Sequence, residues 1–117
     1  MKYLCMVHVD EAMMRELTPD QDRQLARRSL AYDEELMASG HFIAASALQA
    51  PESGTVLRMR NGRVSMTDGP HVETKEHLGG FILIEARDLN EALTVAQGIP
   101  MAAYGSIEVR PEYELKA

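Results

Sequence analysis

Residues 3–9 read YLCMVHV, and residues 81–86 read FILIEA. Short apolar runs of this kind, next to an acidic pair or a glycine pair, are typical of β-strands. Side chains alternate between the two faces of a strand, so Tyr3 and Cys5 point to one face and Leu4 points to the other. A strand with one face in water would alternate apolar with polar residues. Because both faces of these runs are apolar, the sequence predicts a sheet that is covered on both sides.

Two segments have the pattern of helices that cover one face of such a sheet. Residues 18–39 open with a Thr-Pro-Asp-Gln capping box, and Gly40 suits the left-handed conformation that ends a helix. Residues 88–98 form a shorter helix, in which Asp88 is the cap and Glu91 completes the capping box. Each segment carries an apolar stripe at the helical period, which predicts that it packs on the sheet.

Residues 55–67 have the pattern of a β-hairpin. The Asn-Gly dipeptide at 61–62 favours a tight two-residue turn, because both residues tolerate positive φ angles. In this register the apolar residues share one side of the hairpin and three arginines share the other. The apolar side holds Leu57, Met59, Val64 and Met66, and the arginine side holds Arg58, Arg60 and Arg63.

Two further strands, at residues 41–48 and 106–110, complete the pattern. With the hairpin set aside, the order strand-helix-strand occurs twice, which is the split βαβ order of the ferredoxin-like fold. We therefore predict an α+β protein, a ferredoxin-like split βαβ sandwich with an inserted β-hairpin, in a single domain over residues 1–117.

The second face of the predicted sheet needs a cover that the two helices do not provide. An apolar sheet face left in water would exceed the patch that a soluble monomer usually tolerates. We therefore expect a homodimer in which two copies pack through the sheet face around a two-fold axis. The alternative is that the C-terminal tail or the hairpin folds back over this face.

The composition excludes several classes of protein. The chain has 117 residues, 12 basic and 18 acidic, and its formal net charge of −6 argues against a nucleic-acid partner. Its single cysteine, Cys5, excludes an internal disulfide and a multi-cysteine zinc site. No apolar run is long enough to cross a membrane, and the N-terminus lacks the pattern of a secretion signal. We therefore expect a cytoplasmic protein with no membrane partner.

A series of short motifs in the second half of the chain resembles the YCII-related (DGPF-domain) family. The motifs are DGPH at 68–71, ETKE at 73–76, LGGF at 78–81, ARDLNEA at 86–92, IP at 99–100 and GSIEVRP at 105–111. The helix that ends at Gly40 and the Asn-Gly hairpin belong to the same resemblance, which spans nearly the whole chain. It implies a ferredoxin-like fold assembled as a dimeric α/β barrel.

Two residues depart from the pattern of this family. His71 occupies the fourth position of the DGPF motif, where relatives usually have Phe, and an imidazole there can carry a proton. Some relatives use a histidine on the first helix as catalytic base or acid, whereas Ser29 matches that position here. Residues 18–39 contain no histidine at all, so the resemblance is specific for the family and much less specific for a reaction.

The sequence predicts a small-molecule site in the cleft between the sheet and the first helix. Its candidate catalytic residues are Asp68 and His71, and its candidate ligand-binding residues are His8, Ser29, Tyr32, Lys75 and Gly79. The expected chemistry is acid–base chemistry, without a cofactor, on a small aromatic or carboxylated compound. Asp68 also has a structural interpretation, because an Asp before Gly-Pro commonly binds nearby backbone amides.

Two alternatives to this site are left open by the sequence. His71, Glu73 and His77 are residue types that bind zinc, but such a segment is more often a solvated loop, so we expect no metal. The protein could also be a non-catalytic dimeric module with an accessory regulatory role, since relatives are sometimes found beside sigma-factor regulators. An open pocket with converging polar groups would favour the small-molecule site, and a cleft filled by side chains would favour the module.

Overall fold

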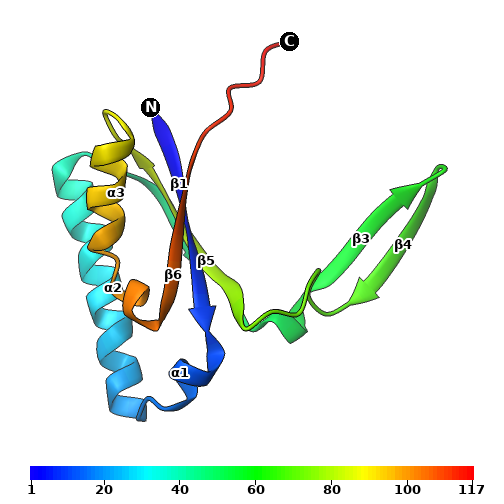
Figure 1. Ribbon diagram of the computed structural model, residues 1–117, viewed down its shortest axis with the longest axis horizontal. Helices are drawn as coiled ribbons and strands as arrows, with labels where there is room; N and C mark the ends of the chain where they lie inside the picture. The colour runs from blue at the N-terminus through cyan, green and yellow to red at the C-terminus, as the bar shows by residue number, and fades with distance from the viewer.

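A four-stranded antiparallel sheet lies at the centre of the computed structural model, which describes residues 1–117 (Figure 1). Its strands are β1 (Lys2–Asp10), β2 (Phe42–Ala47), β5 (Glu76–Glu85) and β6 (Gly105–Pro111), in the order β2-β5-β1-β6. Each neighbouring pair is antiparallel. The predicted α+β class is confirmed, and this strand order is compatible with the ferredoxin-like fold.

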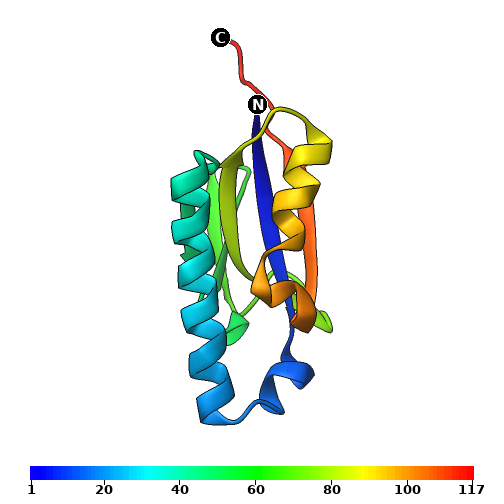
Figure 2. The same cartoon turned by 90° about the vertical axis from the view of Figure 1, so that its left-hand side faces the viewer.

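Two helices cover one face of this sheet, as Figure 2 shows. They are α2 (Pro19–Ser39) and α3 (Leu89–Gln97), whereas the short helix α1 (Glu11–Arg15) lies beyond the end of β1. Two 3-10 turns, η1 (Pro51–Ser53) and η2 (Pro100–Tyr104), lie in the connections after β2 and after α3. No helix combines the length and the apolar composition that crossing a membrane requires.

The ends of α2 follow the predicted capping pattern. The Thr18 hydroxyl accepts a hydrogen bond from the Gln21 amide at 3.1 Å, and the Gln21 side chain accepts one from the Thr18 amide at 2.9 Å. Gly40 ends the helix at φ 81°, a left-handed conformation that strains other residues. The sequence analysis missed α1, which begins because the buried Asp10 carboxylate accepts hydrogen bonds from two backbone amides of the first turn.

Alternation along the strands gives the sheet a buried face towards the helices. This face consists of Tyr3, Cys5, Val7 and Val9 from β1 and of Ile82 and Ile84 from β5. Leu36 of α2 and Val95 of α3 are buried in the same cluster, so both helices are held by one apolar core. The predicted orientation of Tyr3 and Cys5 is therefore confirmed.

The opposite face of the sheet, which we call the open sheet face, lacks a helix; it is apolar on β1 and β5, and β6 adds Glu108 and Arg110 at its edge. Leu4 pairs with Leu83 and Met6 pairs with Phe81 across β1 and β5, which places all four side chains on this face. All four are only half-buried. Figure 1 shows both covering helices on the other side of the sheet and the C-terminal tail extending past its end.

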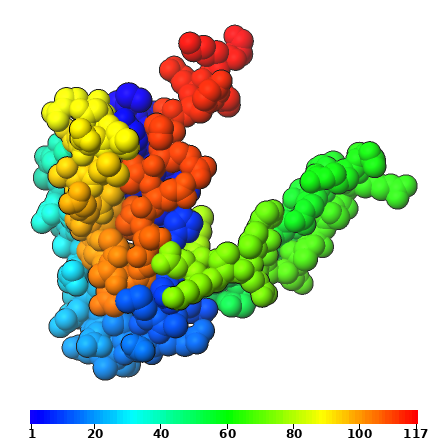
Figure 3. All heavy atoms as spheres, in the orientation of Figure 1, coloured from blue at the N-terminus to red at the C-terminus, as the bar shows by residue number.

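The predicted hairpin forms a separate two-stranded sheet. β3 (Thr55–Arg60) and β4 (Arg63–Asp68) pair around Asn61 and Gly62, whose φ angles are 52° and 72°. The register is the predicted one, so the apolar and arginine sides are those named above. We call this hairpin the arm, because it projects from the body on the side of the open sheet face (Figures 1 and 3). It does not fold back over that face.

The burial of Cys5 predicts that its thiol reacts slowly in the native protein. Cys5 is fully buried, and desolvation raises the pKa of its thiol to about 11. The raised pKa alone lowers the thiolate fraction at mildly alkaline pH by roughly 100-fold, because each pKa unit is a factor of ten. We expect Ellman's reagent to leave the native protein unmodified and to titrate one thiol in denaturant. Rapid modification of the native protein would contradict this packing of β1.

Candidate functional site

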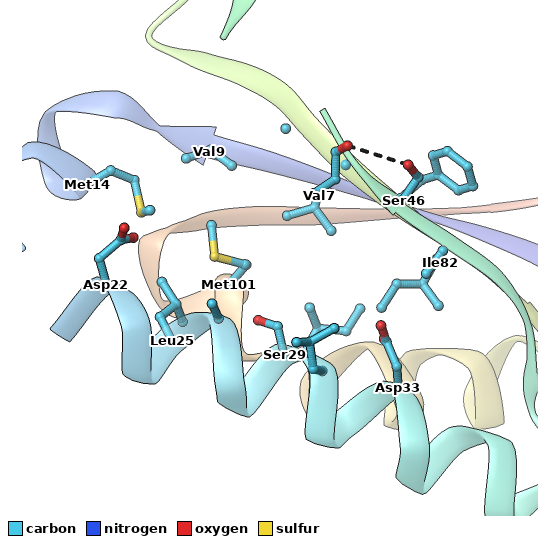
Figure 4. A pocket seen from close by; sticks show the side chains of 18 residues that line it. Val7, Val9, Met14, Asp22, Leu25, Ser29, Asp33, Ser46, Ile82 and Met101 are labelled. Carbon is cyan, nitrogen blue, oxygen red and sulfur yellow. Dashed lines mark hydrogen bonds between the residues drawn. The ribbon is translucent and has the colours of Figure 1, made fainter. Parts of the chain in front are cut away.

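One part of the candidate site is a cavity between α2 and the sheet, shown in Figure 4 and called here the helix-side cavity. Its volume is about 480 Å³, and 12 of its 18 lining residues are hydrophobic. Val7 and Val9 of β1 form part of one wall, and Leu25 of α2 forms part of the other. Met14 and Met101 lie at the end of the cavity near α1 and η2.

Small residues on both walls leave this space open. The α2 wall includes Ala26 and Ser29, and the sheet wall includes Ala45 of β2 with Gly79 and Gly80 of β5. The two glycines have structural reasons to be small. A Cβ on Gly80 would lie 2.7 Å from the backbone oxygen of the adjacent strand, and a Cβ on Gly79 would lie 2.5 Å from a side-chain carbon of β1. The cavity is therefore built into the pairing of the strands.

The polar groups of the helix-side cavity are hydroxyls and carboxylates. Ser29 and Asp33 on α2 point into it, and Asp22 lies at the end nearer α1 (Figure 4). Neither Asp22 nor Asp33 forms an ion pair. Burial raises the pKa of Asp33 above its usual value, because the charged form loses solvent. The cavity thus offers hydrogen-bond acceptors and negative charge but no cationic side chain.

A second cavity, of about 530 Å³, lies at the base of the arm. Its lining includes His8, His71, His77 and Glu76. His8 alternates with the buried residues of β1 and so faces the open side of the sheet, with its Nε2 3.4 Å from Glu108 Oε1. No group of three or more His, Cys, Asp or Glu side chains has a geometry that could hold a metal ion. We call this space the arm-base cavity.

Hydrogen bonds hold part of the arm-base cavity in place. The Ser106 hydroxyl donates to Glu76 Oε1 at 2.6 Å, which ties β6 to β5 across the end of β1. Arg110, and secondarily His8, hydrogen-bond to Glu108 and hold the pKa of that carboxyl below its usual value. His77 Nδ1 is buried without a hydrogen-bond partner.

The structure divides the predicted site residues between these two cavities. Ser29 and Gly79 line the helix-side cavity, as expected for the cleft between sheet and first helix. His8 and His71 line the arm-base cavity instead. The sheet itself separates the two groups, because local spacing along the chain carries no information about which face of the sheet a loop reaches.

Three predicted residues line neither cavity. Asp68 is the exposed last residue of β4. The Lys75 side chain is 84% exposed, and its Nζ lies 3.7 Å from Asp10 Oδ2. Tyr32 turns towards α3, where its hydroxyl donates to the Val95 carbonyl at 2.5 Å. Burial is the main cause of a raised Tyr32 pKa, with the nearby Glu35 carboxylate second.

Asp33 is the residue of the helix-side cavity that the sequence analysis missed. It lies four residues after Ser29, on the same side of α2. That spacing next to the predicted apolar stripe was the available signal, since a carboxylate at the border of a buried stripe loses part of its solvent. The surrounding acidic residues Glu34 and Glu35 are exposed and concealed it.

The hydrogen bond of Tyr32 predicts that this residue contributes to stability. Tyr32→Phe removes only the hydroxyl group that joins α2 to α3, so we expect the free energy of unfolding to fall by about 1 kcal/mol. Urea unfolding followed by circular dichroism measures this loss. Tyr104→Phe is the matched control, because no hydrogen bond from its hydroxyl is present. Equal stability of Tyr32→Phe and the wild type would contradict the hydrogen bond.

Comparison with known proteins places this geometry in a family. Residues 1–116 match the family model of the YCII-related domain. An uncharacterized protein of Rhizobium meliloti (strain 1021) is 32% identical over 113 residues, which cover 95% of this chain and 91% of that relative. The match over almost the whole chain agrees with the motifs noted in the sequence, and the chain belongs to the YCII-related family.

Proposed function

We propose that the protein binds a small, largely apolar molecule in the helix-side cavity. The observation that supports this proposal is an open cavity of about 480 Å³ with a mainly apolar lining and a few polar groups. Small-molecule sites commonly have volumes of about 300–1,000 Å³ and this kind of lining. A cleft filled by side chains would have favoured a module without such a site.

The charges of the cavity narrow the class of ligand. Asp22 and Asp33 are the titratable residues that line it, and both are acidic. A carboxylated ligand would meet like charge in a partly desolvated place, which is unfavourable. A neutral or amine-bearing aromatic compound fits the cavity better than the carboxylated compound that the sequence analysis also considered.

The proposal includes acid–base chemistry without a cofactor. The residue that would donate or accept the proton is Asp33, in place of the pair that the sequence analysis suggested. Asp33 faces the cavity from α2, and burial already favours its protonated form. A carboxyl group with a raised pKa can donate or accept a proton nearer to neutral pH than an ordinary one. The pair Asp68 and His71, which the sequence suggested for this role, lies outside the helix-side cavity.

The open sheet face supports a second proposal, that the protein is a homodimer. Leu4, Met6, Phe81 and Leu83 form an apolar surface that no segment of the same chain covers. Packing of two such faces around a two-fold axis would give the dimeric α/β barrel that the family resemblance implies. Each copy in this assembly would consist of a single YCII-related domain. The dimer contact would leave the helix-side cavity free, because that cavity lies on the helix-covered face of the sheet.

A volume-filling variant tests the small-molecule site. Ser29→Phe places a ring in the helix-side cavity, so we expect the affinity for the neutral probe N-phenyl-1-naphthylamine to fall about 10-fold or more, as its fluorescence titration would show. Ala31→Phe is the matched control, because it adds similar volume on the exposed side of α2. Unchanged affinity in Ser29→Phe would contradict the proposal. Binding lost only in His71→Phe would move the site to the arm-base cavity.

A charge on the open sheet face tests the dimer. We expect light scattering to give the mass of two chains at micromolar concentration. Met6→Glu places a carboxylate beside Phe81 of β5 and Glu108 of β6, so it should weaken the dimer roughly 100-fold, because burying a charge next to a like charge costs several kcal/mol. Thr94→Glu, on the exposed side of α3, should leave the mass unchanged. A wild-type protein of single-chain mass would contradict the dimer.

A further inference from the structure

The arm exposes a large apolar surface that no other part of the same chain covers. Its apolar side presents four large side chains that are each more than half exposed, namely Leu57, Met59, Val64 and Met66. A two-stranded hairpin alone is marginally stable in water. An arm with this surface therefore requires something to pack against, and its own body is not within reach on that side (Figure 3).

The charge of the arm differs in sign from that of the body. Residues 55–68 contain Arg58, Arg60 and Arg63 and one acidic residue, Asp68, which gives a formal charge of +2. The whole chain has −6, so the remaining residues sum to −8, since −6 minus +2 is −8. The surface that fits the arm is therefore apolar and carries carboxylates.

One surface of the body has both properties. We call it the α2–β2 flank and define it as Leu30, Asp33, Glu34, Met37 and Ile43. Leu30, Met37 and Ile43 are among the exposed large hydrophobic residues. The four α2 members are spaced three or four residues apart, so they share one side of the helix. Asp33 and Glu34 give the flank two carboxylates, which match the charge of the arm in size.

The flank also forms part of the mouth of the helix-side cavity. Leu30 and Asp33 line that cavity together with Ala45 and Ala47 of the edge strand β2. An object that lies along the flank would therefore cover the opening between α2 and β2. No other segment of the chain covers it.

The arm is long enough to contact the α2–β2 flank of a second copy. The arm projects on the side of the open sheet face, where the proposed dimer would place the partner (Figure 1). Six residues of a strand, such as those of β3, extend about 20 Å. Two stacked sheets lie about 10 Å apart, and a helix layer adds about 10 Å more, so the arm spans the distance from its own sheet to the partner's helices.

From these observations we propose that the arm of one copy lies along the α2–β2 flank of a second copy and closes the mouth of that copy's helix-side cavity. The apolar side of the arm contacts Leu30 and Met37, and the net positive charge of the arm lies over the acidic surface of α2. Each site of the dimer is then completed by the other chain. This inference rests on the proposed homodimer and on the helix-side cavity as the binding site.

The first experiment locates the arm. The Met66→Cys variant, made without ¹⁵N, carries a nitroxide spin label at residue 66. It is mixed with ¹⁵N-labelled wild-type protein. Cys5 does not react with the spin label because it is buried. We expect paramagnetic broadening of the amides of residues 29–37 in the ¹⁵N-labelled copy. A label on Glu114→Cys in the C-terminal tail is the control and should leave these amides sharp. A mixed dimer without broadening at 29–37 overturns the arm contact and leaves the sheet-face dimer standing.

The second experiment tests closure of the cavity. Leu57→Gln with Met66→Gln removes apolar contacts on one side of the arm, and Ser65→Gln with Thr67→Gln makes the matched change on the other side. We expect the first pair to weaken binding of N-phenyl-1-naphthylamine about 10-fold and the second pair to leave it within about twofold. Equal affinities of both pairs and the wild type overturn the lid. Wild-type protein that is monomeric at all concentrations overturns this inference together with the dimer.

Discussion

The constraint on which the structure depends is a sheet whose central strands, β1 and β5, are apolar on both faces while the chain supplies helices for one face. The buried face is held by Tyr3, Cys5 and Ile84 against α2 and α3. The open face carries Phe81 and Met6 with no cover from the same chain. Full burial of a large apolar side chain from full exposure is worth about 1.5–3 kcal/mol, and these side chains start half-buried, so each gains only part of that. Several such side chains must be buried together to stabilise a dimer, so the contact would involve the whole sheet face and not one residue.

The helix-side cavity follows from the same sheet. β5 must approach β2 and β1 closely, and Gly80 and Gly79 permit this because a Cβ at either position would meet a neighbouring strand. Without side chains there, and with Ala26 and Ser29 opposite them, α2 cannot fill the space below it. The volume is therefore a consequence of strand pairing. Its chemistry comes from one further residue, Asp33, whose position on α2 places a carboxylate at the wall.

Local patterns were sufficient for most elements of the fold. The Thr18 capping box, the left-handed Gly40 and the Asn-Gly turn each depend on neighbours within four residues, and all three are present. α1 was missed because five residues are too few to show a helical period, and its cap, Asp10, also continues a strand. β5 starts at Glu76, well before the apolar run at 81–86, because pairing with β1 extends the strand through polar residues.

The candidate site was harder to predict, for a reason that the sheet makes clear. The sequence analysis placed Ser29 and His71 in one cleft between the sheet and the first helix, but they belong to cavities on opposite sides of the sheet. The residues at the base of the arm, including His71, lie on the open side of the sheet, and no spacing within that segment encodes the side. Tyr32 lies in the predicted stripe of α2, but a carbonyl of α3 is close enough to take its hydroxyl away from the cavity.

The separation of charge between arm and body has a physical meaning only at short range. At physiological ionic strength, interactions between exposed charges are screened beyond about 8 Å. Three arginines on a projecting arm therefore exert little force on the acidic residues of their own helices. The same arginines become effective when the arm lies within a few ångströms of a carboxylate, where an apolar contact also excludes water. A cationic side and an apolar side on one hairpin are thus complementary features of a surface that works in contact with another chain.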